Sequence, residues 1–427
     1  MLRSKGLTDK LIVLGIDGMA EPLVLVSFDL LYAAAGFAHG VRNAISAAVG
    51  IDGSRVRIAY THTHGFIRGL GEEDAASPLG LYYSQGVVRD YNCDDPIDPA
   101  PDLAFFRDIC RKAADLAIAC RDEAIPGNLI HRRTTSYFGV NRRVTKSDGN
   151  TIMAPNPDDS LIDPTLDILT LEDTAGVPRA ILWSYACHPT ICGGTNYLIT
   201  ADYPGGVRRA LEAAYPGVIP VFLQGCGADV RPRATCDGAH FRSFTPEEMT
   251  EASKTLAADI TAALAGPGRV LDVSLACLFD PIRLYAEDRD RAWWQALADN
   301  EEEHDYRRQS ARVALRRLDA GQLRSYLPYP MRCFRLDART CLFAIPNEVV
   351  SDYGKRIRAL FPGLTVIIVS YAEYVTTYIP TRDVLENGGY EAESFLDAGI
   401  TGPFVPEIED IIVGHATDMI LRAVQSD

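Results

Sequence analysis

Two histidines stand close together in the sequence Thr-His-Thr-His-Gly at residues 61–65. Apolar residues alternate with polar or small ones in the run before them, which is the period of a half-buried strand. If this strand continues over residues 55–64, His62 and His64 project from one face, where they either share a metal ion or lie beside it. The alternative is that both are polar residues of the turn that ends the strand.

Two further residues with metal-ligand side chains, His188 and Glu348, stand where other expected strands end. Together with His62 they form a His/His/carboxylate set, which, with an open position for water, is a common catalytic zinc environment. Arg142 and His64 are candidates to position a substrate and to transfer protons. Each residue has a structural alternative: His188 as a strand-end cap, Glu348 as an acid favoured by a helix dipole, and Arg142 as the partner of a surface acid.

The elements that must position these residues alternate between strands and helices. Apolar, β-rich runs predict strands at 11–16, 23–28, 55–64, 166–171, 180–187, 218–223, 341–345 and 366–370. Helical spacing predicts helices over 30–49, 103–124, 207–214, 247–264, 405–425 and from about 348 to 360. The chain also predicts a hairpin turn at Asp17-Gly18, a long loop over 66–101 and a charged, solvated helical excursion over 284–324.

This order of elements predicts an α/β fold in one domain, residues 1–427. Several apolar strands stop at a polar residue suited to chemistry. Because ligands collect at the carboxyl ends of buried strands, we expect these distant residues to meet.

The composition limits the partners. The net charge of -15 and the pI near 5.0 leave no basic face for phosphates, so neither nucleic acid nor an anionic membrane is an expected partner. Ten cysteines without a Cys-x-x-Cys pair suit a reducing compartment. With no signal peptide and no apolar run of membrane-spanning length, a soluble, cytoplasmic protein without membrane insertion is expected.

A series of motifs in the chain resembles, in order, the neutral/alkaline, non-lysosomal ceramidase family. The motifs are Thr-His-Thr-His-Gly at 61–65, Asn-Arg-Arg at 141–143, Tyr-Ala-Cys-His-Pro-Thr at 185–190, Thr-Ala-Asp-Tyr-Pro-Gly at 200–205, Gln-Gly-Cys-Gly-Ala-Asp at 224–229 with Pro232 and Arg233, Ile-Pro-Asn-Glu at 345–348, Tyr-Ile-Pro-Thr-Arg at 378–382 and Gly-Gly-Tyr-Glu at 388–391. Each motif alone is unspecific, whereas the whole series in order covers most of the chain.

The resemblance implies a zinc-dependent amidase whose catalytic domain has mixed sheets flanked by helices. It implies zinc ligands at His62, His188, Glu348 and Tyr378, with Tyr374 as the alternative to Tyr378. A twelve-residue spacing from Tyr378 to Tyr390 favours the former.

The resemblance further implies that His64 and Arg142 contact the substrate and stabilise an oxyanion, with Tyr374 as a supporting catalytic tyrosine. Gln224, Asp229 and Arg231 are the expected substrate-binding residues.

The chain departs from the family pattern in several places. The C-terminal immunoglobulin-like domain and the opening Ile-Thr-Pro strand are not found in this sequence, and Gly65-Phe66 follows the histidines where the family has Ser-Gly-Pro. Arg231 replaces a serine, and an arginine there fits a substrate carboxylate or phosphate that ceramide lacks. The zinc amidase chemistry is therefore expected to transfer more readily than the sphingolipid substrate.

Three functional hypotheses follow. The first is a zinc hydrolase that cleaves an amide, ester or lactone bond of a small-molecule substrate. The second is a binuclear amidohydrolase barrel, which also begins with His-x-His but needs two more histidines and an aspartate. The third is a ceramidase-like binding protein without activity. A homo-oligomer is compatible with each of them.

Overall fold

The structure is a computed structural model that describes residues 11–16, 22–65, 69–76, 98–193, 196 and 198–425. Its largest sheet has the strand order β13-β4-β7-β8-β9, and a second has the order β14-β15-β16-β18. The strands of the first sheet are β4 (Gly127–Thr135), β7 (Thr165–Asp173), β8 (Pro178–Tyr185), β9 (Ile219–Gln224) and β13 (Arg269–Val270). Those of the second are β14 (Ala276–Tyr285), β15 (Tyr326–Asp337), β16 (Thr340–Ala344) and β18 (Thr365–Val369).

A third sheet, β1-β2-β3, completes the centre of the molecule. Its strands are β1 (Leu11–Ile16), β2 (Leu23–Phe28) and β3 (Val56–Tyr60). Each of these three sheets is mixed, because β2–β3, β8–β9 and β16–β18 pair in parallel while the other pairs are antiparallel. Smaller sheets are formed by β10 (Val230–Pro232), β5 (Gly139–Thr145) and β6 (Thr151–Asn156), by β11 (Cys236–Asp237) and β12 (His240–Phe241), and by β17 (Glu348–Val349) and β19 (Tyr378–Ile379).

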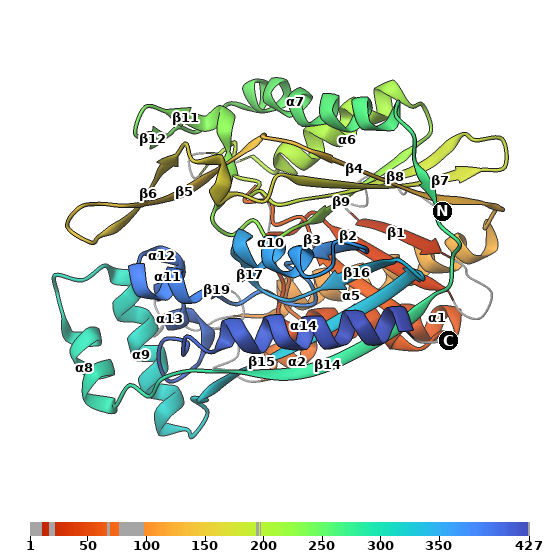
Figure 1. The fold of residues 1–427 in the computed structure, drawn as a ribbon. Helices are drawn as coiled ribbons and strands as arrows, with labels where there is room; N and C mark the ends of the chain where they lie inside the picture. The colour runs from red at the N-terminus through yellow and green to blue at the C-terminus, as the bar shows by residue number, and fades with distance from the viewer. Residues whose placement is uncertain are drawn as a thin grey trace.

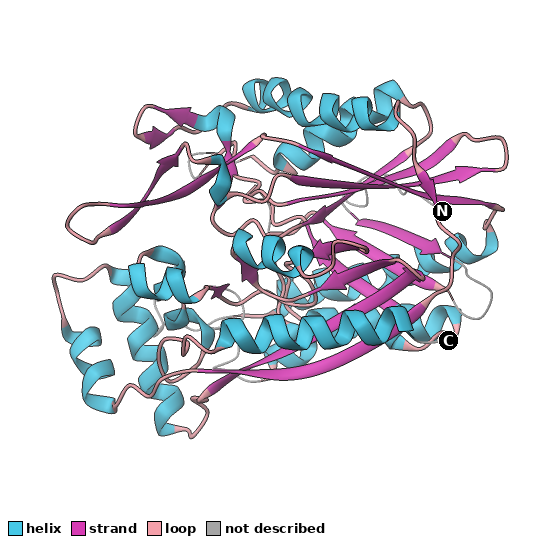
Figure 2. Cartoon of the chain, in the orientation of Figure 1, coloured by secondary structure: helices cyan, strands magenta, loops and turns pink. Residues whose placement is uncertain are grey.

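Helices cover the outer faces of the sheets (Figures 1 and 2). Helices α6 (Asp202–Ala214) and α7 (Pro246–Leu264) pack on the first sheet, and α14 (Ile408–Gln425) lies across the second, next to α10 (Ser351–Ala359). Helices α1 (Ala35–Val49) and α5 (Ala100–Asp122) pack together beside β1 and β3. The remaining helices are α2 (Glu72–Ala75), α8 (Arg291–Asp299), α9 (Asp305–Asp319), α11 (Arg382–Asn387), α12 (Tyr390–Glu393) and α13 (Phe395–Ala398).

The sheets share a core. Leu182 and Val221 of the first sheet lie in one buried cluster with Phe334 and Ile367 of the second and Leu25 of the third. The sheets therefore form the inner layers and face one another, and the helices form the outer layers. Burial of this apolar surface is the main favourable contribution to the stability of the layered fold. The α/β fold with mixed sheets flanked by helices, predicted from the motifs, is confirmed.

Local sequence signals explain several element boundaries. Thr245 caps α7 by accepting a hydrogen bond from the Glu248 amide, and the Glu248 carboxylate accepts one from the Thr245 amide, which together form a capping box. Other boundaries differ from the predictions: α1 begins at Ala35 instead of residue 30, and α10 begins only at Ser351. The predicted turn at Asp17-Gly18 and most of the loop over 66–101 lie outside the described residues.

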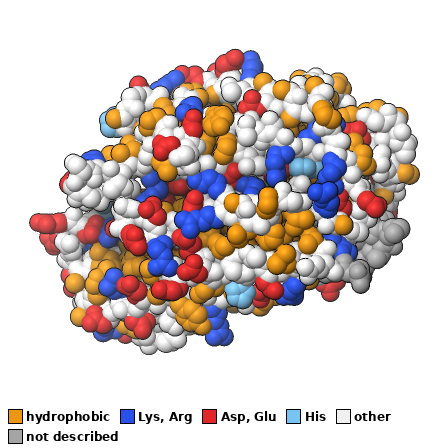
Figure 3. Space-filling model, viewed as in Figure 1, with side chains coloured by type: hydrophobic (Ala, Val, Ile, Leu, Met, Phe, Trp, Pro, Cys, Tyr) orange, Lys and Arg blue, Asp and Glu red, His pale blue; other side chains and the backbone are white. Residues whose placement is uncertain are grey.

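The charged segment 284–324 is only partly solvated, which corrects the prediction of a solvent-exposed excursion. Trp294 of α8 and Val313 of α9 are fully buried, and Trp294 packs edge-on against Phe395 of α13. Acidic and basic side chains are interspersed over the face in Figure 3. Among the described helices, none has the length and apolar character needed to cross a bilayer. The nine cysteines in the described part of the chain are free thiols.

Candidate metal centre

The first histidine lies just beyond the end of β3. The strand stops at Tyr60, and His62 adopts a left-handed backbone with φ of 62°. The expectation that the strand runs straight through both histidines is therefore wrong, because a left-handed residue breaks the alternation of an extended strand. The turn nevertheless brings the imidazole rings of His62 and His64 to a centroid distance of 4.9 Å at an interplanar angle of 90°.

Backbone carbonyls fix the orientation of two imidazoles. Nδ1 of His62 lies 2.7 Å from the Leu31 carbonyl, and Nδ1 of His188, just after β8, lies 2.7 Å from the Gly227 carbonyl. Because a carbonyl only accepts hydrogen bonds, Nδ1 of each ring carries the proton and Nε2 of the neutral ring presents a lone pair. This is the arrangement in which a histidine binds a metal through Nε2.

Glu348 lies between those two lone pairs. Its Oε2 atom is 3.0 Å from His188 Nε2 and 3.2 Å from His62 Nε2. If both rings are neutral, the two lone pairs and the carboxylate oxygen repel one another unless a metal ion or a proton lies among them. The two Nε2 atoms and the carboxylate oxygen are arranged as the donor atoms of a metal site would be.

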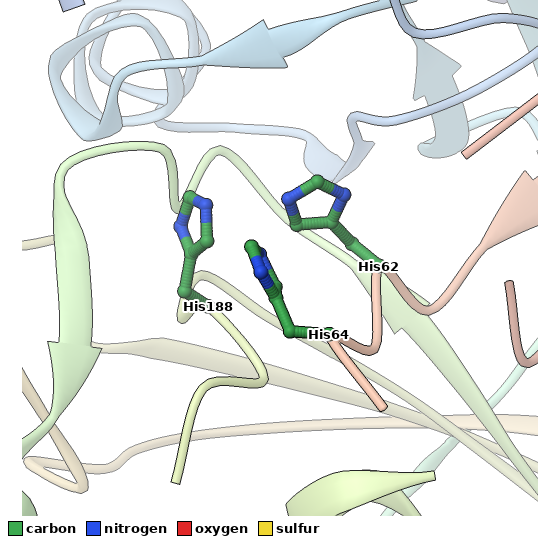
Figure 4. Close-up of side chains that lie close together, drawn as sticks. All are labelled: His62, His64 and His188. Carbon is green, nitrogen blue, oxygen red and sulfur yellow. The ribbon is translucent and has the colours of Figure 1, made fainter. Parts of the chain in front are cut away.

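His64 completes a cluster of three imidazoles from two chain segments (Figure 4). One ligand atom from each of His62, His64 and His188 lies within 4.8 Å of the others. Within the described ranges this is the one group of three or more histidine, cysteine or acidic side chains gathered so closely. A second metal centre of the kind that a binuclear amidohydrolase needs is not found there, and the mixed sheets differ from a barrel.

The surroundings lower the pKa values of His188, His64 and Glu348. Burial, with the charge of Arg142, lowers the pKa of His188 to about 4. His64 reaches the surface but is otherwise surrounded by protein, and this desolvation together with His62 and His188 lowers its pKa well below the usual range. Desolvation alone would raise the pKa of Glu348, but the two facing imidazoles hold it well below its ordinary value. At neutral pH the centre therefore offers the neutral imidazoles of His64 and His188 and the Glu348 carboxylate.

Two tyrosines, Tyr378 and Tyr374, were expected at this centre, and the structure separates them and adds a third, Tyr371. The ring of Tyr378 lies parallel to that of His188, at 6.3 Å and 7°. Tyr371 packs against His62 at 4.5 Å, and its buried hydroxyl has no hydrogen-bond partner among the described residues. The Tyr374 hydroxyl instead donates to the carbonyl of Pro328 on β15, which commits it to another part of the fold.

Arg142 links the centre to a second layer of side chains. Its Nη2 donates to the Tyr378 hydroxyl at 3.3 Å, and its Nε donates to Glu391 at 2.9 Å. Arg143 shares the same glutamate, and the Arg142 guanidinium lies 5.7 Å from the centre of the Tyr390 ring. Buried among these groups, Arg142 is held beside Tyr378 in a fixed direction.

The three predicted substrate-binding residues have different surroundings. Asp229 accepts hydrogen bonds from the backbone and hydroxyl of Ser351 at 2.7 and 3.0 Å and from Asn141 at 3.0 Å, so its oxygens fasten the loop after β9 to α10. The Gln224 side chain is fully buried, and both its amide atoms lack partners in the described part of the chain. Arg231 is half-buried and bonds the Thr190 carbonyl at 3.2 Å.

Tyr371 and Glu391 are the residues that sequence reasoning left without a role. Tyr371 stands directly after β18, in the same kind of strand-end position that drew attention to His188. Glu391 lies in the Gly-Gly-Tyr-Glu motif, but nothing in a linear sequence shows that it binds two arginines about 250 residues away. The strand-end signal would have found the tyrosine; the glutamate needed the structure.

Comparison with known proteins places this geometry in a known fold. No protein-family model and no characterised protein sequence matches the chain. Among solved structures, the architecture is that of the neutral ceramidases, as the motifs predicted. The neutral ceramidase from Pseudomonas aeruginosa matches with a TM-score of 0.65 and 17% identity over 95% of this chain and 67% of that chain. A ceramidase complexed with C2 matches with a TM-score of 0.66 and 16% identity over 96% of this chain and 68% of that one.

Proposed function

We propose that this protein is a zinc-dependent hydrolase that cleaves the carbon–nitrogen bond of an amide in a small molecule. The observation that carries the proposal is the convergence of His62 Nε2 and His188 Nε2 on Glu348 Oε2 at 3.2 and 3.0 Å. Donor atoms of a tetrahedral zinc ion lie about 3.3 Å apart, as follows from bond lengths near 2.0–2.1 Å. The ceramidase-like fold supports an amide as the bond that is cleaved.

The residues around the centre have chemistry suited to that reaction. Bound zinc would polarise the scissile carbonyl and promote deprotonation of water. His64, neutral at pH 7 and open to the surface, would accept the proton from the attacking water and return it to the leaving amine. Arg142, directed by Glu391, would stabilise negative charge that develops on the carbonyl oxygen.

Tyr378 is our choice for the fourth ligand and Tyr371 for an additional hydrogen-bond donor. Tyr378 lies beside Glu348 and His188, whereas the hydroxyl of Tyr374 is bonded elsewhere. The unpartnered hydroxyl of Tyr371 gives the centre one donor that no described residue uses. An ester or lactone substrate would use the same residues, so the panel of test substrates should include both.

Metal analysis and a hydrolysis screen on the same preparations test the proposal. The purified protein should contain about one zinc per chain and hydrolyse at least one compound in a panel of N-acyl amides, ceramide, esters and lactones. His188→Ala should lose zinc and hydrolysis together. His415→Ala is the matched control, because His415 is exposed and bonds Asp280 on β14.

The other outcomes discriminate between the hypotheses. Retention of both zinc and activity in His188→Ala would overturn the ligand assignment. Two metals per chain would favour a binuclear enzyme. Bound zinc without hydrolysis across the whole panel would favour a binding protein.

A further inference from the structure

Arg231 differs from Arg142, Arg143 and Arg242 because no carboxylate of the described residues forms an ion pair with it, although the charge of the buried Asp202 acts on it. Arg142 and Arg143 share Glu391, and Arg242 pairs with Glu248 at 3.0 Å. Arg231 instead donates from Nη2 to the Thr190 carbonyl and lies 4.6 Å from the centre of the Phe241 ring. Its Nε atom is buried and has no hydrogen-bond partner in the described residues. A half-buried guanidinium with an unused donor and no carboxylate in contact is costly unless an anion pairs with it.

Thr190 adds a second unused polar group at the same place. Its side chain is 8% exposed, and its hydroxyl makes no hydrogen bond within the part of the chain that is described. The carbonyl of this threonine accepts a hydrogen bond from Arg231, so the two residues are in contact and their unused polar groups lie in one small region. A hydroxyl and a charged N–H group together suit the two oxygens of a carboxylate.

This surface is close to the catalytic histidines. Thr190 is two residues beyond His188, which limits their Cα separation to about 7 Å. The intervening Pro189 carbonyl accepts a hydrogen bond from the His64 amide at 3.4 Å. On the other side, Val230, the neighbour of Arg231 in β10, accepts a hydrogen bond from the His188 amide at 2.9 Å. Burial and the nearby charge of Arg142 lower the pKa of Arg231, consistent with two guanidinium groups sharing one neighbourhood.

We propose that Arg231 and Thr190 form a carboxylate subsite and that the substrate is an N-acyl amino acid. This inference rests on the proposed amidase function and names its substrate class. One unpaired guanidinium matches a single negative charge, whereas a phosphate dianion calls for more than one free cation. An α-amino acid also places its carboxylate only a few bonds from the amide, as the closeness of Thr190 to His188 requires. Hydrolysis adds water across the C–N bond and releases a carboxylic acid and a free amino acid.

The test compares N-lauroylglycine with N-lauroylethanolamine, which differ only in the reduction of the carboxylate to an alcohol. The unaltered protein should prefer the glycine conjugate. Arg231→Gln should lower kcat/KM for N-lauroylglycine by about 10- to 100-fold, mainly by raising KM. The kcat/KM for N-lauroylethanolamine should change by less than about twofold. Arg231→Lys should recover only part of the loss because lysine lacks the planar fork. Arg242→Gln is the matched control, since Arg242 also stacks on a phenylalanine but is paired with an acid.

A binding measurement separates failure of this inference from failure of the proposed function. N-octylsulfonylglycine cannot be hydrolysed, so its calorimetric affinity reports the subsite even if no substrate is turned over; Arg231→Gln should weaken it by a similar factor. Equal affinity for N-octylsulfonylglycine and N-octylsulfonylethanolamine, or equal loss of both glycine and ethanolamine activities in Arg231→Gln, would overturn the subsite. If the protein prefers an N-lauroyl aminoalkyl phosphate as substrate, the group bound by the subsite is a phosphate and the carboxylate assignment is wrong. If the protein hydrolyses none of these amides but binds the sulfonylglycine selectively, the subsite stands and the proposed amidase function is wrong.

Discussion

Glu348 and Tyr378 lie directly opposite each other on the parallel strands β17 and β19. Both meet His188: the Glu348 carboxylate through a 3.0 Å contact and the Tyr378 ring in a parallel arrangement at 6.3 Å. Paired residues of adjacent strands place their side chains on the same face of a sheet. The two short strands therefore bring two proposed zinc ligands, from different parts of the sequence, onto one histidine.

Replacing Tyr378 by phenylalanine tests whether this hydroxyl belongs to the metal centre. We expect Tyr378→Phe to weaken zinc binding by at least about tenfold in competition with a chelator, because a ligand and the Arg142 contact are lost together. Tyr374→Phe should leave zinc affinity unchanged, because the Tyr374 hydroxyl bonds Pro328. The opposite result, with zinc affinity lost only in Tyr374→Phe, would exchange the two assignments.

Single alanine variants separate the roles of the two histidines that follow β3. His62→Ala should lose most of its zinc, because His62 is buried and its Nε2 faces Glu348. His64→Ala should keep its zinc and lose about 10²- to 10⁴-fold in kcat, the usual contribution of a general acid–base group. Metal content by mass spectrometry and steady-state kinetics on the same samples provide the measurement. Equal loss of zinc in both variants would show that all three imidazoles bind the metal.

The fold class could be predicted because apolar strands and capping signals are local. The strand predicted at 366–370 corresponds to β18, and the helix predicted at 247–264 begins one residue earlier. By contrast, no strand was predicted over β14 and β15. Their sequences contain prolines, which usually mark an edge or the end of a strand. Pro281 and Pro330 do lie opposite each other at such an edge, because β14 is the outer strand of its sheet and β15 pairs with β16 only from Arg332 onward. Prolines at an edge position did not prevent these strands, although they hid them in the sequence.

The metal centre could be predicted only in part, because its residues are joined by contacts that no spacing reveals. The left-handed backbone of His62 replaces the straight strand inferred from alternation. The carbonyls of Leu31 and Gly227 that orient the imidazoles belong to loops without a motif of their own for this task. The tertiary structure, and not the composition, therefore determines which nitrogen of each imidazole faces the proposed metal.

Asp167 makes the stability of the fold depend on pH away from the metal centre. It is buried and bonds His131 at 2.8 Å and Arg133 at 2.7 and 3.0 Å. Burial alone would raise the pKa of Asp167, but these partners lower it below its ordinary value. Since the unfolded chain then binds the proton more tightly, this stabilisation is complete above pH about 4 and is lost as the pH falls further towards the folded pKa.

Urea unfolding at several pH values checks this dependence. Asp167→Asn should be less stable than the unaltered protein by about 2–3 kcal/mol at pH 7, because the buried His131 and the partly exposed Arg133 lose the carboxylate that they bond. The difference should narrow as the pH falls below about 4. Asp418→Asn, which alters an exposed pair with Arg422, should show little change at any pH. A difference that stays constant with pH would mean that Asp167 does not titrate in this range.

Among the described residues, Glu373 is the one carboxylate that forms ion pairs with Arg42, Arg57 and Arg332. Arg42, Arg57 and Arg332 all contact its oxygens, and its side chain is only 6% exposed. Removing the negative charge leaves three desolvated cations facing one another, so we expect Glu373→Gln to lower the free energy of unfolding by about 3–5 kcal/mol. Arg332→Gln should cost much less, because it relieves repulsion and leaves the carboxylate with two partners.

Urea unfolding followed by circular dichroism, with the m-value held as a check on two-state behaviour, measures both variants. The decisive quantity is the difference between the losses of unfolding free energy in the two variants. If only close packing around this cluster mattered, both substitutions would lower the free energy of unfolding by similar amounts. Electrostatic compensation predicts instead that losing the lone acid is several kcal/mol worse than losing one of three bases. Equal destabilisation would therefore refute the charge argument even if both variants unfold more easily.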